Sequence, residues 1–236
     1  MIEEGSLEIV FENDLLVAIN KPHGLLAHRS ALARDAKQFA VQQLRNQIGQ
    51  HVFPIHRLDR KTAGVMVFCK QKQYLDNYFS LFRERQVDKT YHAIVRGYTE
   101  DEGVIDYALI NEKGQTQEAI TKFRTIDRFE LDLPFGKYKS SRYALVEAKP
   151  ETGRMHQIRK HFAHIFHPII GDRPHGCNKQ NKLWKEQWAM DKMLLHARAI
   201  QFTDPVSNEC LIIKAGYQTV FQNSLDMLVG NSKKDQ

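Results

Sequence analysis

The amino-acid sequence predicts an α+β fold in which helices and loops flank a mixed, largely antiparallel central sheet. Short apolar runs with strand character outnumber the segments that have helical periodicity. Several successive runs are joined by short turns, an arrangement that favours antiparallel hairpins over alternating βαβ units. The chain contains neither G-x-G-x-x-G nor G-x-x-x-x-G-K-[ST], so we do not expect a Rossmann-type or P-loop nucleotide site.

The strands are expected where apolar or alternating runs end at turn-forming residues. They are residues 7–11, 15–19, 65–68, 90–96, 104–109, 119–126, 143–148, 197–202 and 210–214. Asn13 and Asp14 separate the first two strands as in a hairpin, and residues 204–208, Asp-Pro-Val-Ser-Asn, separate the last two. Tyr91 and Val95 share one face of their strand, because side chains alternate along it.

The helices are expected where apolar residues recur with a period near 3.6. They are residues 36–48, 71–85, 155–166 and 220–228. The second has the clearest pattern, with apolar side chains at i, i+3, i+4 and i+7 from Leu75 to Phe82. Gly49 lies just past the first helix, and Pro168 follows the third, which are positions where helices end.

The composition is that of an ordinary globular protein, since 42% of the 236 residues are hydrophobic and 26% are charged. This length predicts a single domain over residues 1–236, and no apolar run approaches the roughly 20 residues of a membrane span. The acidic first residues lack the basic and apolar regions of a signal peptide. Three cysteines without a C-x-x-C pair argue against disulfides and a Cys-based zinc site, and favour the cytoplasm.

Positive charge is concentrated in one segment. Residues 151–185 contain seven Lys or Arg against two Asp or Glu, and five of the 11 histidines, whereas the whole chain carries a net charge of +6. Two interpretations fit this segment, a solvated basic face or a surface that binds phosphate groups. The three-residue spacing of His161, His164 and His167 could also serve zinc. The chain has no H-E-x-x-H, however, so solvated or nucleic-acid-facing histidines are favoured over a metal site.

Three segments carry residue types suited to chemistry. Asp59 lies between Arg57 and Arg60 before an apolar strand, and a carboxylate beside arginines tends to stay ionised. Such a carboxylate suits a nucleophile, although a surface ion-pair cluster gives the same pattern. Residues 153–161 place Arg and Gln donors near a helix start, which suits phosphate or base contacts or a plain basic face. Tyr91 suits core packing or stacking on a base.

Together these segments resemble the RluA-type pseudouridine synthase family. The matching segments, in family order, are N-K-P-H-G at 20–24, H-R-L-D at 56–59 with T-A-G at 62–64, K-T-Y-H-A-I-V-R-G at 89–97, G-R-M-H-Q-I-R-K-H at 153–161, H-P-I-I-G-D at 167–172 and L-L-H-A at 194–197. The match runs from about residue 8 to residue 216. Ala63 stands where the family usually has serine, which puts one local hydrogen bond in doubt.

The resemblance implies the pseudouridine synthase catalytic fold with an active-site cleft. Many members of the family carry a preceding S4 RNA-binding domain, but the first expected strand begins near Leu7, so none is expected here. It implies an enzyme that isomerises uridine in RNA to pseudouridine with no metal and no cofactor. Asp59 would be the nucleophilic carboxylate, Arg159 its ion-pair partner, and Tyr91 the residue that stacks on the uracil and helps to remove the C5 proton. Whether Asp59 attacks C1′ or first promotes an elimination stays open. Ile158 and Leu195 would form apolar walls of the uracil pocket.

The expected partner is RNA. Arg57 would enter the RNA where the target nucleotide has flipped out. The residues expected to bind RNA are Arg57, Arg154, His156, Gln157, Lys160 and Lys182. Residues 27–30, 47–53, 175–176 and 180–181 resemble those of family members that modify uridine 65 in the T-stem of tRNA, so tRNA is the expected substrate. Neither a membrane nor an obligate protein partner is implied.

Three alternatives remain open on the sequence. The first is a ribosomal RNA pseudouridine synthase of the same family. The second is a non-catalytic RNA-binding protein, against which the intact set of Asp59, Tyr91 and Arg159 argues. The third is a metallohydrolase with histidine ligands, which metal analysis of the purified protein would test.

Overall fold

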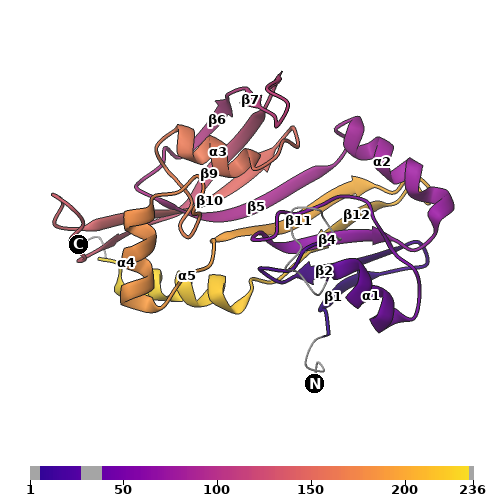
Figure 1. Cartoon of the computed structure of the whole chain (residues 1–236), viewed down its shortest axis with the longest axis horizontal. Helices are drawn as coiled ribbons and strands as arrows, with labels where there is room; N and C mark the ends of the chain where they lie inside the picture. The colour runs from indigo at the N-terminus through magenta and orange to yellow at the C-terminus, as the bar shows by residue number, and fades with distance from the viewer. Residues whose placement is uncertain (1–5, 28–38, 234–236) are drawn as a thin grey trace. The chain divides into compact units, whose positions relative to one another are not determined.

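The computed structural model describes residues 6–27 and 39–233, and its elements confirm the predicted α+β fold (Figure 1). The strands are β1 (Ile9–Glu12), β2 (Leu16–Lys21), β3 (Phe53–Pro54), β4 (Ala63–Cys69), β5 (Asp88–Arg96), β6 (Glu102–Asp106), β7 (Leu109–Ile110), β8 (Thr116–Gln117), β9 (Ile120–Leu131), β10 (Ser141–Pro150), β11 (Leu195–Thr203) and β12 (Cys210–Lys214). The helices are α1 (Ala40–Ile48), α2 (Leu75–Arg83) after a 3-10 turn (Lys72–Tyr74), α3 (Gln157–His164), α4 (Asn178–Trp188) and α5 (Thr219–Asn231).

The chain divides into two compact units, residues 1–89 with 197–216 and residues 90–196 with 217–236. The first unit is built on β1, β2, β4 and most of β11, in that order. Strand β3 pairs with β4, β12 pairs with β11, and β2 is antiparallel to both β1 and β4. Helix α2 adds Tyr78 and Leu81 to a hydrophobic core shared with these strands. The amphipathic helix predicted from its apolar spacing is therefore confirmed.

Gly64 allows a close backbone approach in the first unit. It has a left-handed φ of +110°, and a Cβ atom at this position would lie 2.2 Å from the carbonyl oxygen of Ala197. Both the backbone conformation and the available space therefore require glycine. The start of β4 is fixed against β11 in this way, directly after the turn that carries Asp59.

The second unit is built on β5, β10, β9 and β6, in that order, and the pairings along this series are antiparallel. Strand β10 divides its alternating side chains between two cores. Tyr143 and Leu145 pack with α4 and α5 on one face, and Ala144 and Val146 pack with α3 on the other. Figure 1 shows α3 on one side of β9 and β10, and α4 and α5 on the other side.

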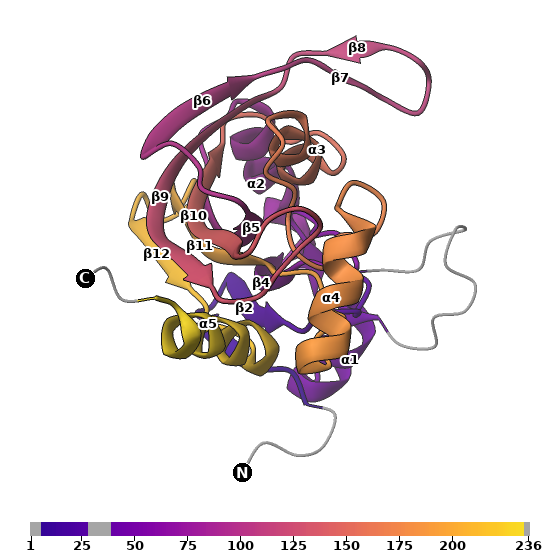
Figure 2. The same ribbon diagram turned by 90° about the vertical axis from the view of Figure 1, so that its left-hand side faces the viewer.

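A short hairpin extends from the second unit. Strands β7 and β8 pair with each other, and the turn between them is held by Asn111, whose side-chain oxygen accepts hydrogen bonds from the backbone N–H groups of Lys113 and Gln115. Figure 2 shows this hairpin reaching past α3. The sequence predicted a single strand at 104–109 in this region, whereas the structure has β6 and then the separate β7.

Helix α4 was absent from the sequence prediction. Its side chains are mainly Lys, Asn, Gln and Trp, and the buried ones are Gln180 and Trp184. The sequence therefore lacks the apolar stripe by which an amphipathic helix is predicted. Helix α3 begins at Gln157 and not near residue 155, because His156 before it has a left-handed backbone. Residues 36–38 of the first predicted helix lie outside the described ranges, and α1 begins at Ala40. No helix in the described parts of the chain is long and apolar enough to cross a membrane.

Replacing Gly64 by alanine is expected to destabilise the protein much more than replacing Gly49. Both glycines have a left-handed φ, but nothing lies within 4 Å of a Cβ at Gly49, which ends α1. Alanine at 49 should therefore cost only the backbone strain of about 1–2 kcal/mol. Alanine at 64 also meets the Ala197 backbone, and we expect a loss of more than about 3 kcal/mol. Urea unfolding followed by circular dichroism measures both, and equal losses would contradict the proposed clash.

Candidate active site

Asp59 lies in the first unit, in the turn that leads into β4. Its carbonyl oxygen accepts a hydrogen bond from the Thr62 backbone N–H at 3.0 Å, and the side chain is half-buried. The neighbouring Leu58 is buried, whereas Arg57 and Arg60 are exposed. The leucine anchors this segment in the core, while the two arginines on either side of Leu58 and Asp59 reach solvent.

His56 connects the same segment to β4 and α2. Its Nε2 accepts a hydrogen bond from the backbone N–H of Val67 at 3.0 Å, and its ring stacks on Phe82. Removal from water, and then the positive charge of Lys89, lower the pKa of His56 to about 4. The imidazole is therefore neutral at pH 7 and acts as a hydrogen-bond acceptor that ties the segment to β4.

Lys21 joins the Asn-Lys-Pro-His-Gly segment to the residue after Asp59. Its side chain is fully buried, and its ammonium group donates hydrogen bonds to the carbonyl oxygens of Pro22 at 3.1 Å, Leu25 at 2.9 Å and Arg60 at 3.3 Å. Burial lowers the pKa of Lys21 to about 7, and the charge of Asp59 acts in the opposite direction. The two sequence motifs are thus joined by a buried, titratable cation whose pKa depends on the charge of Asp59.

Tyr91 lies in the second unit, on β5 opposite Ala148 of β10. Its partly buried side chain packs against the core cluster that contains Ile158 of α3 and Leu195 of β11. Tyr91 thus lies in the same cluster as Ile158 and Leu195, the two residues for which the resemblance implied a uracil pocket, and the pocket itself stays a prediction. Ala63, which stands where the family usually has serine, is buried at the start of β4 in the other unit.

Arg159 is almost fully buried, with 4% of its side chain exposed, and is held by Asp172, which has 1% exposed. Its Nε donates to Oδ2 and its Nη2 donates to Oδ1, both at 2.8 Å, so the pair forms a two-bond fork. The sequence did not single out Asp172, although it ends the H-P-I-I-G-D motif that signalled it. Asp59 belongs to the other unit, and its pairing with Arg159 stays a prediction.

Gln157 is buried and does not lie at the surface, and its contact with RNA stays a prediction. It is 4% exposed, and its amide is engaged inside the second unit. Its nitrogen donates to the carbonyl oxygen of Ile120 and the hydroxyl of Thr121, and its oxygen accepts from the Thr152 hydroxyl and the Arg154 backbone N–H. A buried amide needs such partners, so Gln157 holds the start of α3 against β9.

His156 precedes α3 with a left-handed backbone, φ 56° and ψ 26°, which is strained for a residue with a side chain. Its Nδ1 lies 3.0 Å from Nε2 of His175, so the two imidazoles share a hydrogen bond. The backbone N–H of His175 also points toward Oδ1 of Asp172 at 3.5 Å. This histidine pair therefore joins the start of α3 to the segment that carries the partner of Arg159.

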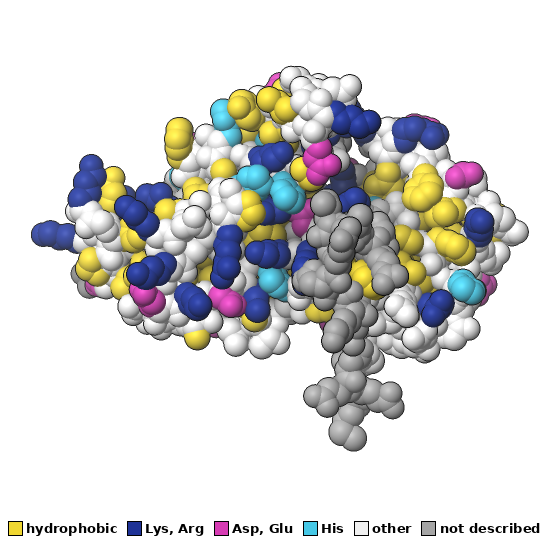
Figure 3. All heavy atoms as spheres, in the orientation of Figure 1, with side chains coloured by type: hydrophobic (Ala, Val, Ile, Leu, Met, Phe, Trp, Pro, Cys, Tyr) yellow, Lys and Arg dark blue, Asp and Glu magenta, His cyan; other side chains and the backbone are white. Residues whose placement is uncertain are grey.

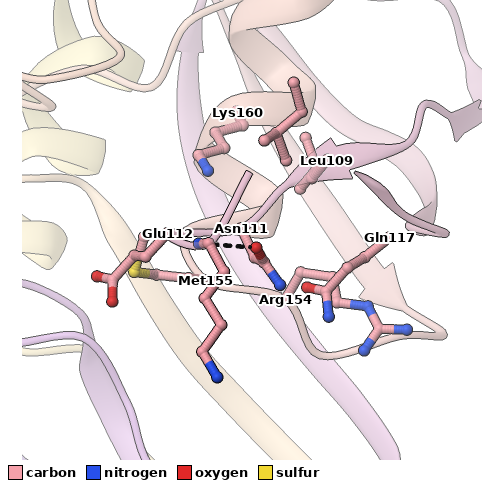
Figure 4. Close-up of a pocket in the computed structure, with 9 residues that line it drawn as sticks. Leu109, Asn111, Glu112, Gln117, Arg154, Met155 and Lys160 are labelled. Atoms are coloured by element: carbon pink, nitrogen blue, oxygen red, sulfur yellow. Dashed lines mark hydrogen bonds between the residues drawn. The ribbon is translucent and has the colours of Figure 1, made fainter. Parts of the chain in front are cut away.

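Arg154 and Lys160 line a cavity of about 230 Å³ with the β7–β8 hairpin and Met155. Figure 4 shows Arg154 beside Gln117 on one side of this cavity, and Met155 near Glu112 on the other. The Nε of Arg154 donates to the carbonyl oxygen of Glu118 at 2.9 Å. The sequence missed the contribution of the hairpin, although the Asn-Glu-Lys-Gly turn at 111–114 signals it.

The three histidines considered for zinc each contact a backbone carbonyl oxygen or an aromatic ring. His161 is within hydrogen-bond distance of the Tyr107 carbonyl oxygen, His164 stacks on the Tyr107 ring, and His167 is within hydrogen-bond distance of the Arg96 carbonyl oxygen. Among the residues that the structure describes, no group of three or more His, Cys, Asp or Glu side chains is placed to hold a metal ion.

Residues 15–164 match the RNA pseudouridylate synthase family. Over 227 residues the chain is 45% identical to tRNA pseudouridine synthase C of Vibrio parahaemolyticus, and the alignment covers 92% of each chain. The chain belongs to this family. It is also 42% identical over 230 residues to tRNA pseudouridine synthase C of Salmonella typhimurium, which covers 93% of this chain and 88% of that relative.

Solved structures agree in fold. Human RNA Pseudouridylate Synthase Domain Containing 1 matches with a TM-score of 0.71 at 21% identity, covering 98% of both chains. Human RNA Pseudouridylate Synthase Domain Containing 4 matches with a TM-score of 0.71 at 25% identity, covering 94% of this chain and 93% of its own. Family membership confirms the enzyme class that the motifs predicted, and the chain is a pseudouridine synthase, an isomerase.

The buried ammonium of Lys21 should make stability depend on pH. Its pKa is about 7 in the folded chain and 10.5 as the ordinary value, so between these two pH values the unfolded chain binds more protons. The free energy of unfolding should therefore rise with pH in this window, by up to about 1.4 kcal/mol per pH unit. Urea unfolding of the parent and Lys21→Met proteins at several pH values measures this, because the variant lacks the contribution.

The Asp59→Asn protein is the control for this measurement. Because Asp59 favours the protonated form of Lys21, Asp59→Asn should lower the pKa of Lys21 further. The rise in stability with pH should then begin at a lower pH than in the parent. Parallel pH profiles for the parent and Lys21→Met proteins would show that Lys21 does not titrate in this window.

Proposed function

We propose that this pseudouridine synthase acts in the cytoplasm on tRNA and isomerises uridine 65 in the T-stem. The observation that carries the proposal is the similarity to tRNA pseudouridine synthase C, 45% identity with 92% of each chain covered. A ribosomal RNA target is the alternative within the same chemistry. We further propose that the two compact units work together as one catalytic domain.

The chemistry that we propose begins at Asp59. Its carboxylate serves as the nucleophile at C1′, or promotes elimination there, while the N1–C1′ bond of the target uridine breaks. One feature of the structure supports this role. Lys21 donates a hydrogen bond to the carbonyl oxygen of Arg60, the residue after Asp59, and the negative charge of Asp59 favours the protonated form of Lys21. A cation held by three carbonyl oxygens keeps the segment in place whichever route the reaction takes.

The second unit supplies the groups that handle the detached uracil. In this proposal C5 of the detached uracil bonds to C1′, and Tyr91 stacks on the base and helps to remove the C5 proton. Ile158 and Leu195 close the apolar sides of the pocket. Their membership of one core cluster supports a shared pocket. Arg159 provides positive charge for the carboxylate, and its fork with Asp172 gives the guanidinium a single orientation.

RNA is gripped by basic side chains at the surface. Arg57 is exposed next to Asp59, in the position proposed for the space that the flipped nucleotide leaves. Arg154, His156 and Lys160 are partly exposed at the start of α3, and Lys182 is exposed on α4. Flipping is necessary because a carboxylate cannot reach C1′ and C5 of a uridine that is stacked and paired in the stem.

Asp59→Asn should abolish pseudouridine formation while RNA binding stays nearly intact. Amide oxygen is a poor nucleophile, whereas affinity for RNA comes mainly from contacts with phosphates. Tritium release from RNA labelled at C5 of uridine measures turnover, and filter binding measures affinity. Turnover within about tenfold of the parent would contradict the assignment of Asp59 as nucleophile.

Two substitutions separate the proposed roles of Tyr91. Tyr91→Phe keeps the ring and removes the hydroxyl, so it should bind RNA normally and lose turnover. Tyr91→Ala should lose both, because stacking on a base contributes about 1–3 kcal/mol. The tritium-release and binding assays apply again. Equal turnover in the parent and Tyr91→Phe proteins would leave Tyr91 with a packing role alone.

The proposed target is tested by offering three RNAs, namely unmodified tRNA transcripts, a T-arm stem-loop and large-subunit ribosomal RNA. Pseudouridine is mapped by carbodiimide treatment and primer extension. We expect a product at the T-stem position of tRNA, and a preference for intact tRNA, because the paired base edges lie in a deep groove that side chains cannot read. Modification confined to ribosomal RNA, or equal rates on unstructured oligomers, would refute the target and leave the enzyme class standing.

A further inference from the structure

A second cavity lies in the second unit, beside α4. It has a volume of about 210 Å³, and its wall includes Gly171, Arg173, Asn181, Lys182, Lys185 and Asp191. Arg173, Lys182 and Lys185 are exposed, so their charges stand at the surface around the cavity. Figure 3 shows Lys and Arg side chains gathered over the part of this face where α4 lies.

The charges around this cavity favour an anion. Three cationic side chains face one carboxylate, that of Asp191. Lys182 also lies 3.6 Å from Glu186 one turn along α4, but 75% and 57% of these side chains are exposed. An exposed pair of this kind contributes little to stability, so it does not hold Lys182 away from a bound anion.

One wall of the cavity is fixed by Asn181. Its side-chain oxygen accepts a hydrogen bond from the Gly171 backbone N–H at 2.8 Å, and its nitrogen donates to the Asp172 carbonyl oxygen at 2.7 Å. From the other side, a Cβ at Gly171 would lie 1.9 Å from the Lys192 carbonyl oxygen, so the two backbones pack with no room for a side chain between them. One wall of the cavity is therefore a closely packed, hydrogen-bonded segment.

The same segment carries the carboxylate that holds Arg159. Asp172 follows Gly171 directly, and its side chain forms the buried fork with the guanidinium. Two hydrogen-bonded steps thus connect the side chain of Asn181 at the cavity wall to the proposed catalytic arginine. An RNA strand whose target uridine reaches Arg159 would pass close to the cavity, because one short segment borders both.

We propose that this cavity is a binding site for a backbone phosphate of the RNA substrate, held by Arg173, Lys182 and Lys185. The proposal rests on the proposed function, since it takes tRNA to be the substrate. Phosphate oxygens accept hydrogen bonds from guanidinium and ammonium groups, and such contacts fix the register of a strand without reading its sequence. The site would hold the substrate in place beside the segment that orients Arg159.

The test compares charge changes inside and outside the cavity. Arg173→Ala and Lys185→Ala each remove a lining cation, whereas Lys179→Ala removes an exposed cation from α4 that does not line the cavity. Binding of an unmodified tRNA transcript is measured at a series of KCl concentrations. Each lining variant should flatten the slope of log affinity against log salt by about 0.7–0.9, and Lys179→Ala should change it by much less.

Asp191→Asn should have the opposite effect. Removing the carboxylate that lines the cavity should lower the Kd for tRNA by about two- to fivefold, the range of an exposed charge pair. Equal slope changes in the Lys179→Ala and Lys185→Ala proteins, or no gain from Asp191→Asn, would overturn the site. Lining variants that change the binding of inorganic phosphate but not of tRNA would overturn its assignment to RNA.

Measuring pseudouridine formation in the same transcript separates a failure of the proposed function from a failure of the proposed phosphate site. If the parent protein binds tRNA with the expected slopes but makes no pseudouridine in it, the proposed function fails while the phosphate site stands. If the parent modifies tRNA and the lining variants bind it like the control, the site fails while the function stands.

Discussion

The second unit depends on the buried fork between Arg159 and Asp172. Removing two charges from water is costly, and only well-aligned hydrogen bonds between them offset that cost. The alignment is set by the residues before Asp172, because Ile169 packs into the core beside α3 and Ile170 into the core beside α4 and α5. The backbone N–H of Ile170 also donates to the Ile94 carbonyl oxygen at 3.0 Å. Packing on both faces of the sheet therefore decides where the carboxylate lies.

Lys21 is also a buried cation, but its hydrogen-bond partners are neutral carbonyl groups. It is surrounded by carbonyl dipoles in place of a carboxylate fork, so burial is compensated less completely and its pKa falls to about 7. A guanidinium does not lose its proton in a protein, whereas an ammonium does when it is buried. Arg159 is thus suited to supply a permanent charge, and Lys21 to hold a loop in place with a charge that depends on Asp59 and on pH.

The sequence predicted those features that are local in the chain. Apolar alternation placed Tyr91 in a strand, and Asp59 was placed directly before an apolar strand; both descriptions agree with the structure. The partner of Arg159 was not predicted, because Asp172 is 13 residues away and reaches it only through packing around β5. The burial of Gln157 was not predicted for the same reason, since the two acceptors of its amide nitrogen lie on β9, 36 and 37 residues away.

Helix α3 directs neighbouring charged side chains to different surroundings. Arg159 and Lys160 are neighbours in the chain, but the first is buried in the fork with Asp172 and the second lines the open cavity beside the β7–β8 hairpin. Successive residues of a helix point about 100° apart, so one turn presents charge both inward and outward. In the proposed function, Lys160 contacts RNA from the same helix that holds Arg159. The position of the substrate and that of the guanidinium would then be linked through the backbone of α3.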